Sequence, residues 1–298
     1  MTGRIHYTHC PGCNSTNLKP VMEVVDYTVS GEAFPIVECV SCTLRFTQDV
    51  PNATSISPYY KSEDYVSHSN ASKGLVNRVY YAVRKRTMKR KRQLVEAGTR
   101  KRQGVLLDYG SGVGTFADEM KRYGWEVKGL EPDGDARQVA QSQYGISLQD
   151  TTELFNLTAG SFDAITLWHV LEHVHDLSAC IQQLKQVLKD DGRIFIAVPN
   201  YTSADAETYR EQWAAYDVPR HLYHFSPQSM QTLMQRFGMK VIRYTPMWYD
   251  SFYISLLSSK YRKGKTSWAE AIWNGCRSNL RAIGDYKKSS SVIYTISK

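Results

Sequence analysis

The chain has 298 residues and a net charge of +8 at pH 7, and 42% of its residues are hydrophobic. This composition can bury a full-sized core, which excludes a disordered or fibrous protein. No stretch approaches the roughly 18 consecutive apolar residues of a membrane-spanning helix. The first residues, MTGRIHYTHCPGC, also lack the apolar run of a secretory signal. We therefore expect a cytoplasmic protein with two domains, or one large domain with an appendage.

The N-terminal region contains two C-x2-C pairs separated by 25 residues. Two thiolates on a tight turn can face one ion, and two such turns complete a tetrahedron around zinc. All four positions are sulfur, so none is left open and the pattern predicts a structural site rather than a catalytic one. Two redox pairs or unrelated buried thiols are the alternative interpretation. We predict a zinc-ribbon-like module over residues 1–50, with the ligands Cys10, Cys13, Cys39 and Cys42.

A strongly basic segment follows within residues 51–103, which we interpret as a helical linker. Between Arg84 and Arg102 there are ten Lys or Arg and one acid, Glu96, so this segment alone carries +9. Apolar residues at helical spacing predict an amphipathic helix over residues 74–97 with a basic outer face. Two interpretations stay open: a solvated surface, or a docking strip for an anionic substrate, a phospholipid surface or RNA.

The most informative motif is VLLDYGSGVGTF at residues 105–116. A short apolar run typical of a buried parallel strand leads into a glycine-dense turn and then a helix from about Thr115 to Tyr123. Glycines let the backbone approach a ligand closely, and the helix start offers free N–H groups. A second strand, residues 125–130, ends in Glu131, whose carboxylate can accept hydrogen bonds from both ribose hydroxyls. The pattern indicates a nucleotide-type ligand.

This D-x-G-x-G-x-G motif, with an acid at the end of the second strand, resembles the class I S-adenosylmethionine-dependent methyltransferases. Cysteine knuckles ahead of such a core resemble a bacterial subgroup that acts on small molecules, including sugars. The resemblance covers roughly residues 104–298 and continues through SFDAIT (161–166), LEHV (171–174), a helix ending in LKDDG (188–192), the strand RIFIAVPN (193–200) and RHLYHFSPQSM (220–230).

The resemblance implies a doubly wound, Rossmann-like α/β fold with a seven-stranded sheet. The alternation of apolar strands and helical segments independently favours a doubly wound parallel sheet. One departure is the stretch 149–152, QDTT, where the family often has an acid followed by a small or apolar residue near the adenine. By position, the resemblance implies that S-adenosylmethionine is bound by Asp108, Gly110, Ser111, Gly112, Gly114, Phe116, Glu131, Pro132, Asp150, Thr151, Leu167 and Trp168.

An insertion of about 247–289 separates two C-terminal strands, residues 239–244 and 291–296, which the family would pair as an antiparallel edge hairpin. The insertion is rich in apolar and aromatic residues. Such residues usually face a core. The alternative is a lid over the acceptor pocket, with Arg262 to Lys265 as its exposed turn.

The acceptor site is expected beyond the carboxyl ends of the strands. The strand 164–167 runs into His169 and His173, and His221 follows the fifth strand. Histidine can serve as the base for a hydroxyl acceptor because its ordinary pKa is near ~6.5. Taken alone, each of these three histidines is more often a structural residue than a catalytic one. Some relatives bind a divalent metal through E-x-x-E-H; here His169 replaces the first acid of that pattern, and a metal stays an open alternative.

The favoured function is therefore methyl transfer to a small acceptor, in particular a hydroxyl of a sugar, lipid precursor or secondary metabolite. An anionic or lipid-linked acceptor and peripheral membrane contact are compatible with the basic segment. The first alternative is an RNA methyltransferase that uses the zinc module and the basic helix. The second is a cofactor-binding adaptor without turnover.

Overall fold

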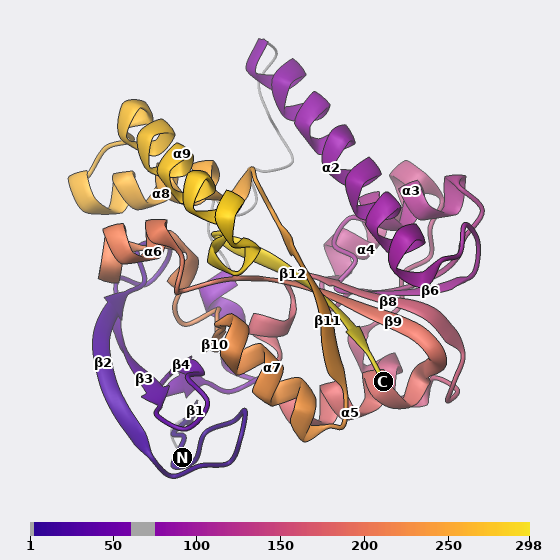
Figure 1. Cartoon of the computed structure of the whole chain (residues 1–298), viewed down its shortest axis with the longest axis horizontal. Coiled ribbons are helices and arrows are strands. Elements are labelled where there is room, and N and C mark those ends of the chain that lie inside the picture. The colour runs from indigo at the N-terminus through magenta and orange to yellow at the C-terminus, as the bar shows by residue number, and fades with distance from the viewer. Residues whose placement is uncertain (1–2, 61–74) are drawn as a thin grey trace. The chain divides into compact units, whose positions relative to one another are not determined.

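The structure is a computed structural model, and it describes residues 3–60 and 75–298 (Figure 1). Contacts group the chain into two units. Unit 1 contains Met1–Ser67, Leu171–Ser178 and Ala197–Tyr294; unit 2 contains His68–Val170, Ala179–Ile196 and Thr295–Lys298. Each unit is described by itself. The functional division into residues 1–50, 51–103 and 104–298 stays a prediction.

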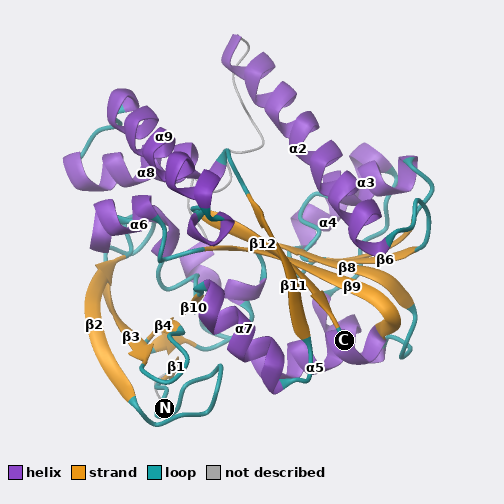
Figure 2. Cartoon of the chain, viewed as in Figure 1, coloured by secondary structure: helices purple, strands orange, loops and turns teal. Residues whose placement is uncertain are grey.

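Unit 2 is a parallel sheet with helices on both faces. Strand β6 pairs in parallel with β7 and with β8, and Leu106 and Leu107 of β6 are completely buried. Helices α2 and α3 lie on one side of these strands and α5 on the other (Figure 2). Cover on both faces explains the continuous apolar run of β6. The elements in this region are α2 (Leu75–Thr99), β6 (Val105–Tyr109), α3 (Thr115–Arg122), β7 (Glu126–Leu130), α4 (Gly134–Tyr144), η3 (Thr151–Asn156), β8 (Phe162–Trp168), α5 (Leu177–Val187) and β9 (Leu188–Pro199).

The main sheet has six strands in the order β11-β12-β9-β8-β6-β7, and β9 and β12 have residues in both units. The place expected for a seventh strand holds a single bridge, in which Gln149 pairs with Leu130. The Glu131 N–H donates to the Gln149 carbonyl at 2.8 Å. Asp150 then caps η3, so the chain turns away before a strand can extend. The doubly wound Rossmann-like fold is confirmed, with six strands where seven were expected.

The segment LKDDG differs from expectation. Residues 188–192 were expected to end a helix, but α5 ends at Val187 and β9 begins at Leu188. Two aspartates and a glycine have low helix propensity. In addition, Lys189 donates to the Asp163 carboxylate of β8 at 2.9 Å, which holds this segment along the sheet.

Unit 1 combines the N-terminal segment with the C-terminal half of the chain. The N-terminal segment contains an antiparallel hairpin of β2 and β3, and its sheet has the order β10-β4-β3-β2, with Tyr223 of β10 opposite Phe46 of β4. The elements are β1 (Arg4–Ile5), β2 (Leu18–Val25), β3 (Ala33–Cys39), β4 (Arg45–Thr47), β5 (Val50–Pro51), η1 (Ser57–Tyr60), η4 (Leu171–His173), α6 (Ala204–Tyr209), η5 (Arg210–Gln212), η6 (Ala214–Tyr216), β10 (Tyr223–His224), α7 (Pro227–Arg236), β11 (Lys240–Pro246), α8 (Asp250–Lys263), α9 (Trp268–Gly284), η7 (Tyr286–Lys288) and β12 (Ser291–Ser297).

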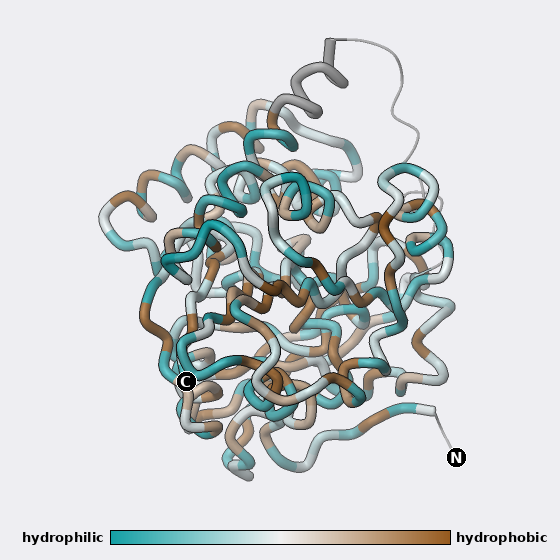
Figure 3. The backbone as a smooth tube through the Cα atoms, turned by 90° about the vertical axis from the view of Figure 1, so that its right-hand side faces the viewer, coloured by the Kyte–Doolittle hydropathy of each residue, from teal (hydrophilic) through white to brown (hydrophobic). Residues whose placement is uncertain are grey.

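The insertion contributes to the core of unit 1. Ile254 of α8 is buried with Phe34 and Ile36 of the N-terminal hairpin and with Trp213, and Tyr261 packs against the same cluster. Core packing therefore accounts for the apolar residues of α8. Hydrophobic and hydrophilic stretches alternate along the helices, as expected for helices with one buried face (Figure 3). Among the described residues, every helix is too short or too polar to cross a membrane.

Candidate cofactor and acceptor sites

The glycine turn after β6 has a backbone that only glycine adopts easily. Gly110, Gly112 and Gly114 have φ values of 76°, 54° and 77°. A Cβ on Gly110 would lie 2.3 Å from Cγ2 of Val170, so this glycine is needed for packing. A Cβ on Gly112 would meet nothing within 4 Å. The backbone at Gly112 is therefore open to a ligand, which fits a bound cofactor at this turn.

Glu131 connects this turn to the end of β7. Its carboxylate accepts hydrogen bonds from the backbone N–H of Gly112 at 2.7 Å and from that of Asp133 at 3.0 Å. The side chain is only 8% exposed, and burial raises its pKa above the ordinary value. Each carboxylate oxygen has a second acceptor position. The same group can therefore shape the turn and still accept hydrogen bonds from ribose hydroxyls.

Asp108 lies buried at the end of β6. Its Oδ1 accepts a hydrogen bond from the Thr166 hydroxyl of β8 at 2.7 Å, and the Ser111 hydroxyl donates to the Asp108 carbonyl at 2.7 Å. Burial raises the pKa of the Asp108 carboxyl. These contacts fix the start of the turn against the neighbouring strand.

Sequence reasoning missed Arg137 of α4, although it connects three of the predicted cofactor residues. Its guanidinium donates to the carbonyls of Glu131 and Pro132 and to the Asp150 carboxylate. Asp150 also accepts from the Thr152 N–H at 2.9 Å as the cap of η3, which begins at Thr151. The sequence does contain a signal for Arg137, because a cation in the first turns of α4 can reach the carbonyls of the loop that precedes the helix.

An aromatic pair stands at the end of β8, after the buried Leu167. The rings of Phe116 and Trp168 meet edge to face, with centroids 5.2 Å apart. The Lys91 ammonium of α2 lies 4.4 Å from the centre of the Trp168 ring. At least one cation of the basic segment thus supports the predicted cofactor residues.

The rest of the basic helix is divided between internal and exposed cations. The Arg92 side chain is buried and pairs with Glu96 at 2.7 Å and with Glu119 at 3.0 Å. In contrast, Lys85 and Lys89 are exposed. The two interpretations of this helix, solvated surface and docking strip, therefore both stay open for its exposed side.

Two of the three candidate histidines come together in unit 1. The ring centroids of His173 and His221 lie 4.7 Å apart. One possible ligand atom from each of these histidines and from the buried Glu172 lies within 4.8 Å of the other two. We refer to Glu172, His173 and His221 as the acceptor cluster. The cluster found among the described residues does not include His169, which belongs to unit 2 and has a φ of 60°.

Backbone carbonyls orient both rings of the acceptor cluster. The Nδ1 atom of His173 lies 3.0 Å from the Arg220 carbonyl, and that of His221 lies 2.8 Å from the Ala215 carbonyl. A carbonyl can only accept, so we assign the ring proton to Nδ1 in both residues, which leaves Nε2 as an acceptor when the ring is neutral. Burial lowers the pKa of His173 to about 4. Together with the Glu172 carboxylate, the cluster presents acceptors that can take a proton or hold a cation.

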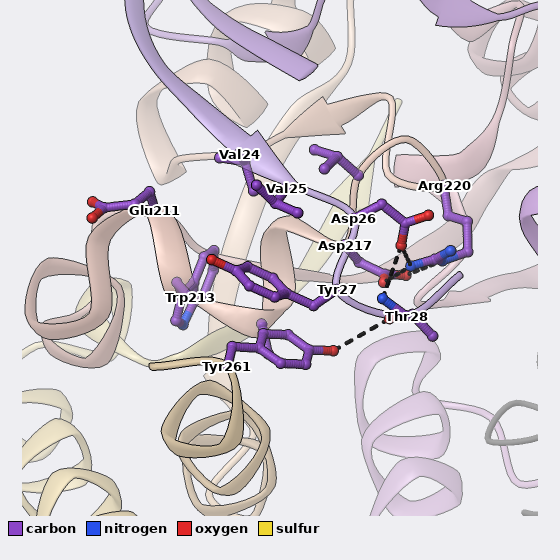
Figure 4. Close-up of a pocket in the computed structure, with 12 residues that line it drawn as sticks. Val24, Val25, Asp26, Tyr27, Thr28, Glu211, Trp213, Asp217, Arg220 and Tyr261 are labelled. Atoms are coloured by element: carbon purple, nitrogen blue, oxygen red, sulfur yellow. Dashed lines mark hydrogen bonds and ion pairs between the residues drawn. The ribbon is translucent and has the colours of Figure 1, made fainter. Parts of the chain in front are cut away.

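Arg220, another residue that sequence reasoning missed, lies in a network beside His221. It is 2% exposed and donates to Asp26 at 3.0 Å, to Asp217 at 2.6 Å and to the Tyr59 carbonyl at 2.7 Å. Figure 4 shows the guanidinium in contact with both carboxylates. The cavity beside it holds about 10 Å³, room for roughly one water molecule. We interpret this network as a support for the loop and not as a substrate pocket.

The four N-terminal cysteines form one cluster built from two matching turns. The Sγ atoms of Cys10 and Cys42 are 3.5 Å apart, as are those of Cys13 and Cys39, and all four lie within 4.8 Å of one another. A tetrahedral zinc with Zn–S bonds of about 2.3 Å would place its sulfurs about 3.8 Å apart. The cluster therefore fits a structural zinc ion.

The backbone of the two turns repeats in detail. The Asn14 N–H donates to the Cys10 carbonyl and the Thr43 N–H to the Cys39 carbonyl, both at 2.8 Å. Asn14 and Thr43, each directly after the second cysteine of its pair, have φ values of 64° and 62°. This repeated conformation aims both thiols of each pair at the same point.

The sheet order, the glycine turn and the acid after β7 define an S-adenosylmethionine-dependent methyltransferase of class I. A family model described as "Methyltransferase domain" matches residues 80–244. The chain belongs to this family.

The curated relatives are similar over half of this chain. A ubiquinone biosynthesis O-methyltransferase of Rattus norvegicus mitochondria is 30% identical over 49% of this chain and 47% of its own length. An enzyme of the same name from Xanthomonas axonopodis is 27% identical over 49% of this chain and 66% of its own. The match thus spans about half to two thirds of these relatives.

A solved structure is similar over nearly the whole chain. The 1,6-didemethyltoxoflavin-N1-methyltransferase of Burkholderia thailandensis, with bound 1,6-didemethyltoxoflavin and S-adenosylhomocysteine, has a TM-score of 0.52. It covers 94% of this chain and 99% of its own, at 13% identity. This likeness supports the fold.

Proposed function

We propose that this enzyme methylates a hydroxyl of a small-molecule acceptor, and that His221 accepts the hydroxyl proton. The observation that carries the proposal is the acceptor cluster, in which the Ala215 carbonyl orients His221 so that Nε2 is its acceptor atom. Burial lowers the pKa of His173 to about 4, which makes this residue a poor proton acceptor. Asp217, with Oδ2 at 4.0 Å from His221 Nε2, would stabilise the imidazolium that forms after proton transfer.

The cofactor residues divide the remaining work. When bound, S-adenosylmethionine supplies an activated methyl group on a sulfonium, which is already a good leaving group. The open backbone at Gly112 would hold the donor, and Glu131 would accept hydrogen bonds from its ribose. Positioning the acceptor in line with the methyl group contributes several kcal/mol through avoided entropy loss. A positioned base contributes a further ~10²- to 10⁴-fold in rate.

Two further facts support a small hydroxyl acceptor. Glu172 follows Trp168 by only four residues, a length of chain that spans at most about 14 Å when extended. The acceptor cluster therefore begins shortly after the strand end where the cofactor residues lie. The names of the curated relatives specify transfer to oxygen in ubiquinone biosynthesis, which favours an oxygen acceptor here as well.

A divalent metal in the acceptor cluster is the second candidate mechanism, favoured by the convergence of Glu172, His173 and His221. Two imidazoles and one carboxylate are a donor set that suits zinc or another transition metal better than magnesium. A metal held by these three residues would polarise the acceptor hydroxyl. The two mechanisms predict different amounts of bound metal per chain. A metal in the cluster adds a second equivalent per chain beside the four-cysteine site.

The decisive experiment follows labelled methyl groups from S-adenosylmethionine into fractionated cell extract. We expect label in small polar or lipid metabolites, and a fall of ~10²-fold or more in turnover for His221→Asn. His6→Asn, an exposed histidine far from the cluster in the chain, is the matched control and should keep full activity. Label in RNA alone would replace our proposal with an RNA methyltransferase, and no label in any fraction would favour an adaptor.

Metal analysis of the same proteins separates base from metal catalysis. One equivalent of zinc in the wild-type protein, lost in Cys39→Ser and kept in His221→Asn, supports the base mechanism. Two equivalents, of which His221→Asn loses one, would establish the metal mechanism instead.

A further inference from the structure

Helix α9 has an unusual distribution of side chains, with its large apolar residues outside. The buried face consists of small residues: Ala271, Asn274, Gly275, Ser278 and Ala282. The small face allows close packing on α8, since a Cβ on Gly275 would lie 2.4 Å from the Phe252 ring. The exposed large residues are Trp268, Ile272, Trp273, Leu280 and Ile283. The core of unit 1 therefore leaves the large apolar side chains of α9 without cover.

These exposed residues form one continuous face. At 3.6 residues per turn, they fall within an arc of about 140°, together with Ala269, Cys276 and Asn279, and this arc contains no charged residue. Trp268 is 66% exposed and Trp273 is 72% exposed. An apolar face of this kind on a protein surface usually marks an interaction site. We refer to it as the α9 face.

The residues around the α9 face are strongly basic. Between Lys260 and Lys288 there are eight Lys or Arg and only two acids, Glu270 and Asp285, a net charge of +6. Glu270 is already paired with Arg262 and Lys263. The rest of the chain outside this segment and outside residues 84–102 carries −7. Positive charge is thus concentrated at the two ends of the apolar helix and along one border.

We propose that the α9 face binds the surface of a membrane that contains anionic lipids. An amphipathic helix with tryptophans on its apolar face and basic residues at its edges is suited to lie in the interface of a bilayer. Its 17 residues span about 25 Å, enough to lie along the surface. The basic residues would attract the anionic head groups, and each contributes to binding only within a short screening distance.

An anionic membrane surface complements the positive charge around the α9 face better than a second copy of the chain does. A twofold contact through the α9 face would bring the +6 segments of two copies together, and like charges across an interface oppose association. A membrane with anionic lipids instead offers the opposite charge. The inference does not depend on the proposed acceptor, because it rests on the insertion and not on the acceptor cluster.

The test is sedimentation of the full chain with vesicles of equal parts phosphatidylglycerol and phosphatidylcholine, and with vesicles of phosphatidylcholine alone. We expect binding to the first, little binding to the second, and weaker binding at high salt. The double variant Trp268→Ser with Trp273→Ser should lower the partition coefficient at least ~10-fold. The control Phe155→Ser replaces an aromatic residue that is 57% exposed on η3 and should bind like the wild type.

Three results would overturn the proposal: no binding to anionic vesicles, equal binding to both vesicle types, or unchanged binding by the double variant. Light scattering of the same proteins without lipid tests whether the α9 face binds a second copy of the chain instead. A dimer that dissociates in the double variant, together with absent vesicle binding, would assign the α9 face to self-association. Circular dichroism that matches the wild type ensures that the double variant is folded.

Discussion

The Nδ1 atom of His173 lies 3.0 Å from the backbone carbonyl oxygen of Arg220, the residue directly before His221. The ring of one histidine is thus oriented by the backbone next to the other. The side chain of Arg220 points into a network with Asp26 and Asp217, and Asp217 Oδ2 lies 4.0 Å from His221 Nε2. The geometry of the acceptor cluster therefore depends on a buried ion network that includes a turn of the N-terminal hairpin.

Arg220→Met should strongly destabilise the protein. The substitution leaves the Asp26 carboxylate, which is completely buried, without its cation, and breaking one partner of a buried pair costs about 3–5 kcal/mol. Urea denaturation at pH 7 measures this loss. Arg243→Met, at an exposed position of β11, is the control and should change the free energy of unfolding by less than about 0.5 kcal/mol. Equal effects of the two variants would show that the Arg220 network contributes no net stability.

Glu131→Ala should weaken cofactor binding by at least ~10-fold, which is about 1.4 kcal/mol. The variant removes the acceptor of the Gly112 and Asp133 N–H groups, so the glycine turn loses its support together with the proposed ribose contact. Calorimetric titration with S-adenosylhomocysteine measures the change. Glu126→Ala replaces an exposed glutamate at the start of β7 and should keep wild-type affinity. Unchanged affinity in Glu131→Ala would remove this residue from the cofactor site.

Cys39→Ser should abolish the zinc binding predicted for the four-cysteine cluster and lower the melting temperature. A serine hydroxyl is a much weaker zinc ligand than a thiolate, and metal binding contributes directly to the stability of a site built from two short turns. Metal analysis of the purified protein gives the first readout and thermal unfolding the second. Cys276→Ser, an exposed thiol outside the cluster, should alter neither. A zinc content that stays at the wild-type level in Cys39→Ser would contradict the predicted ligand set.

Asp163→Asn should make the free energy of unfolding less dependent on pH in the acid range. Burial opposes the charge of the Asp163 carboxylate, but hydrogen bonds from Lys101, the Val105 N–H and Lys189 outweigh it and lower its pKa to about 2. Because the folded pKa is below the unfolded value of 3.8, this stabilisation is present above pH 3.8 and is lost as the pH falls towards 2. At pH 7 it amounts to about 2 kcal/mol.

Urea denaturation at pH 7 and near pH 3 measures the difference between Asp163→Asn and the wild type, which should shrink at the lower pH. Asp191→Asn is a matched control, because Asp191 also accepts from Lys101 but is exposed to solvent. We expect Asp191→Asn to change the free energy of unfolding little at either pH. A difference between Asp163→Asn and the wild type that stays constant with pH would show that titration of Asp163 does not contribute.

Local patterns in the sequence predicted the methyltransferase half of the fold well. The apolar run of β6, the glycine turn and the helix after it are determined by residues within about a dozen positions of one another, so their physical causes are visible in the sequence. The end of the sheet at Gln149 was not visible, because it depends on Asp150 capping η3 rather than on strand propensity. Strand pairing ends at Gln149 and the cap of η3 is the next residue, Asp150, so the two alternatives differ over only these two residues.

Long-range contacts account for what the sequence did not reveal. The motif around His221 suggested a candidate base, but the network of Arg220 with Asp26 joins residues 194 positions apart, and no spacing rule predicts it. The same holds for the acceptor cluster, in which His173 and His221 meet while His169 does not. The α9 face was missed for a different reason. Helical periodicity shows that one face is apolar, but it does not show which face the core covers.

The pairing of β4 with β10 has a consequence for the order in which the protein can fold. The N-terminal strands are made early in synthesis, whereas Tyr223 and His224 leave the ribosome about 180 residues later. Until then the outer edge of β4 has unpaired backbone groups, and an exposed strand edge can pair with other chains. A fragment that stops before residue 223 would keep this open edge and should tend to aggregate, even if the predicted zinc holds the cysteine turns of the early segment together.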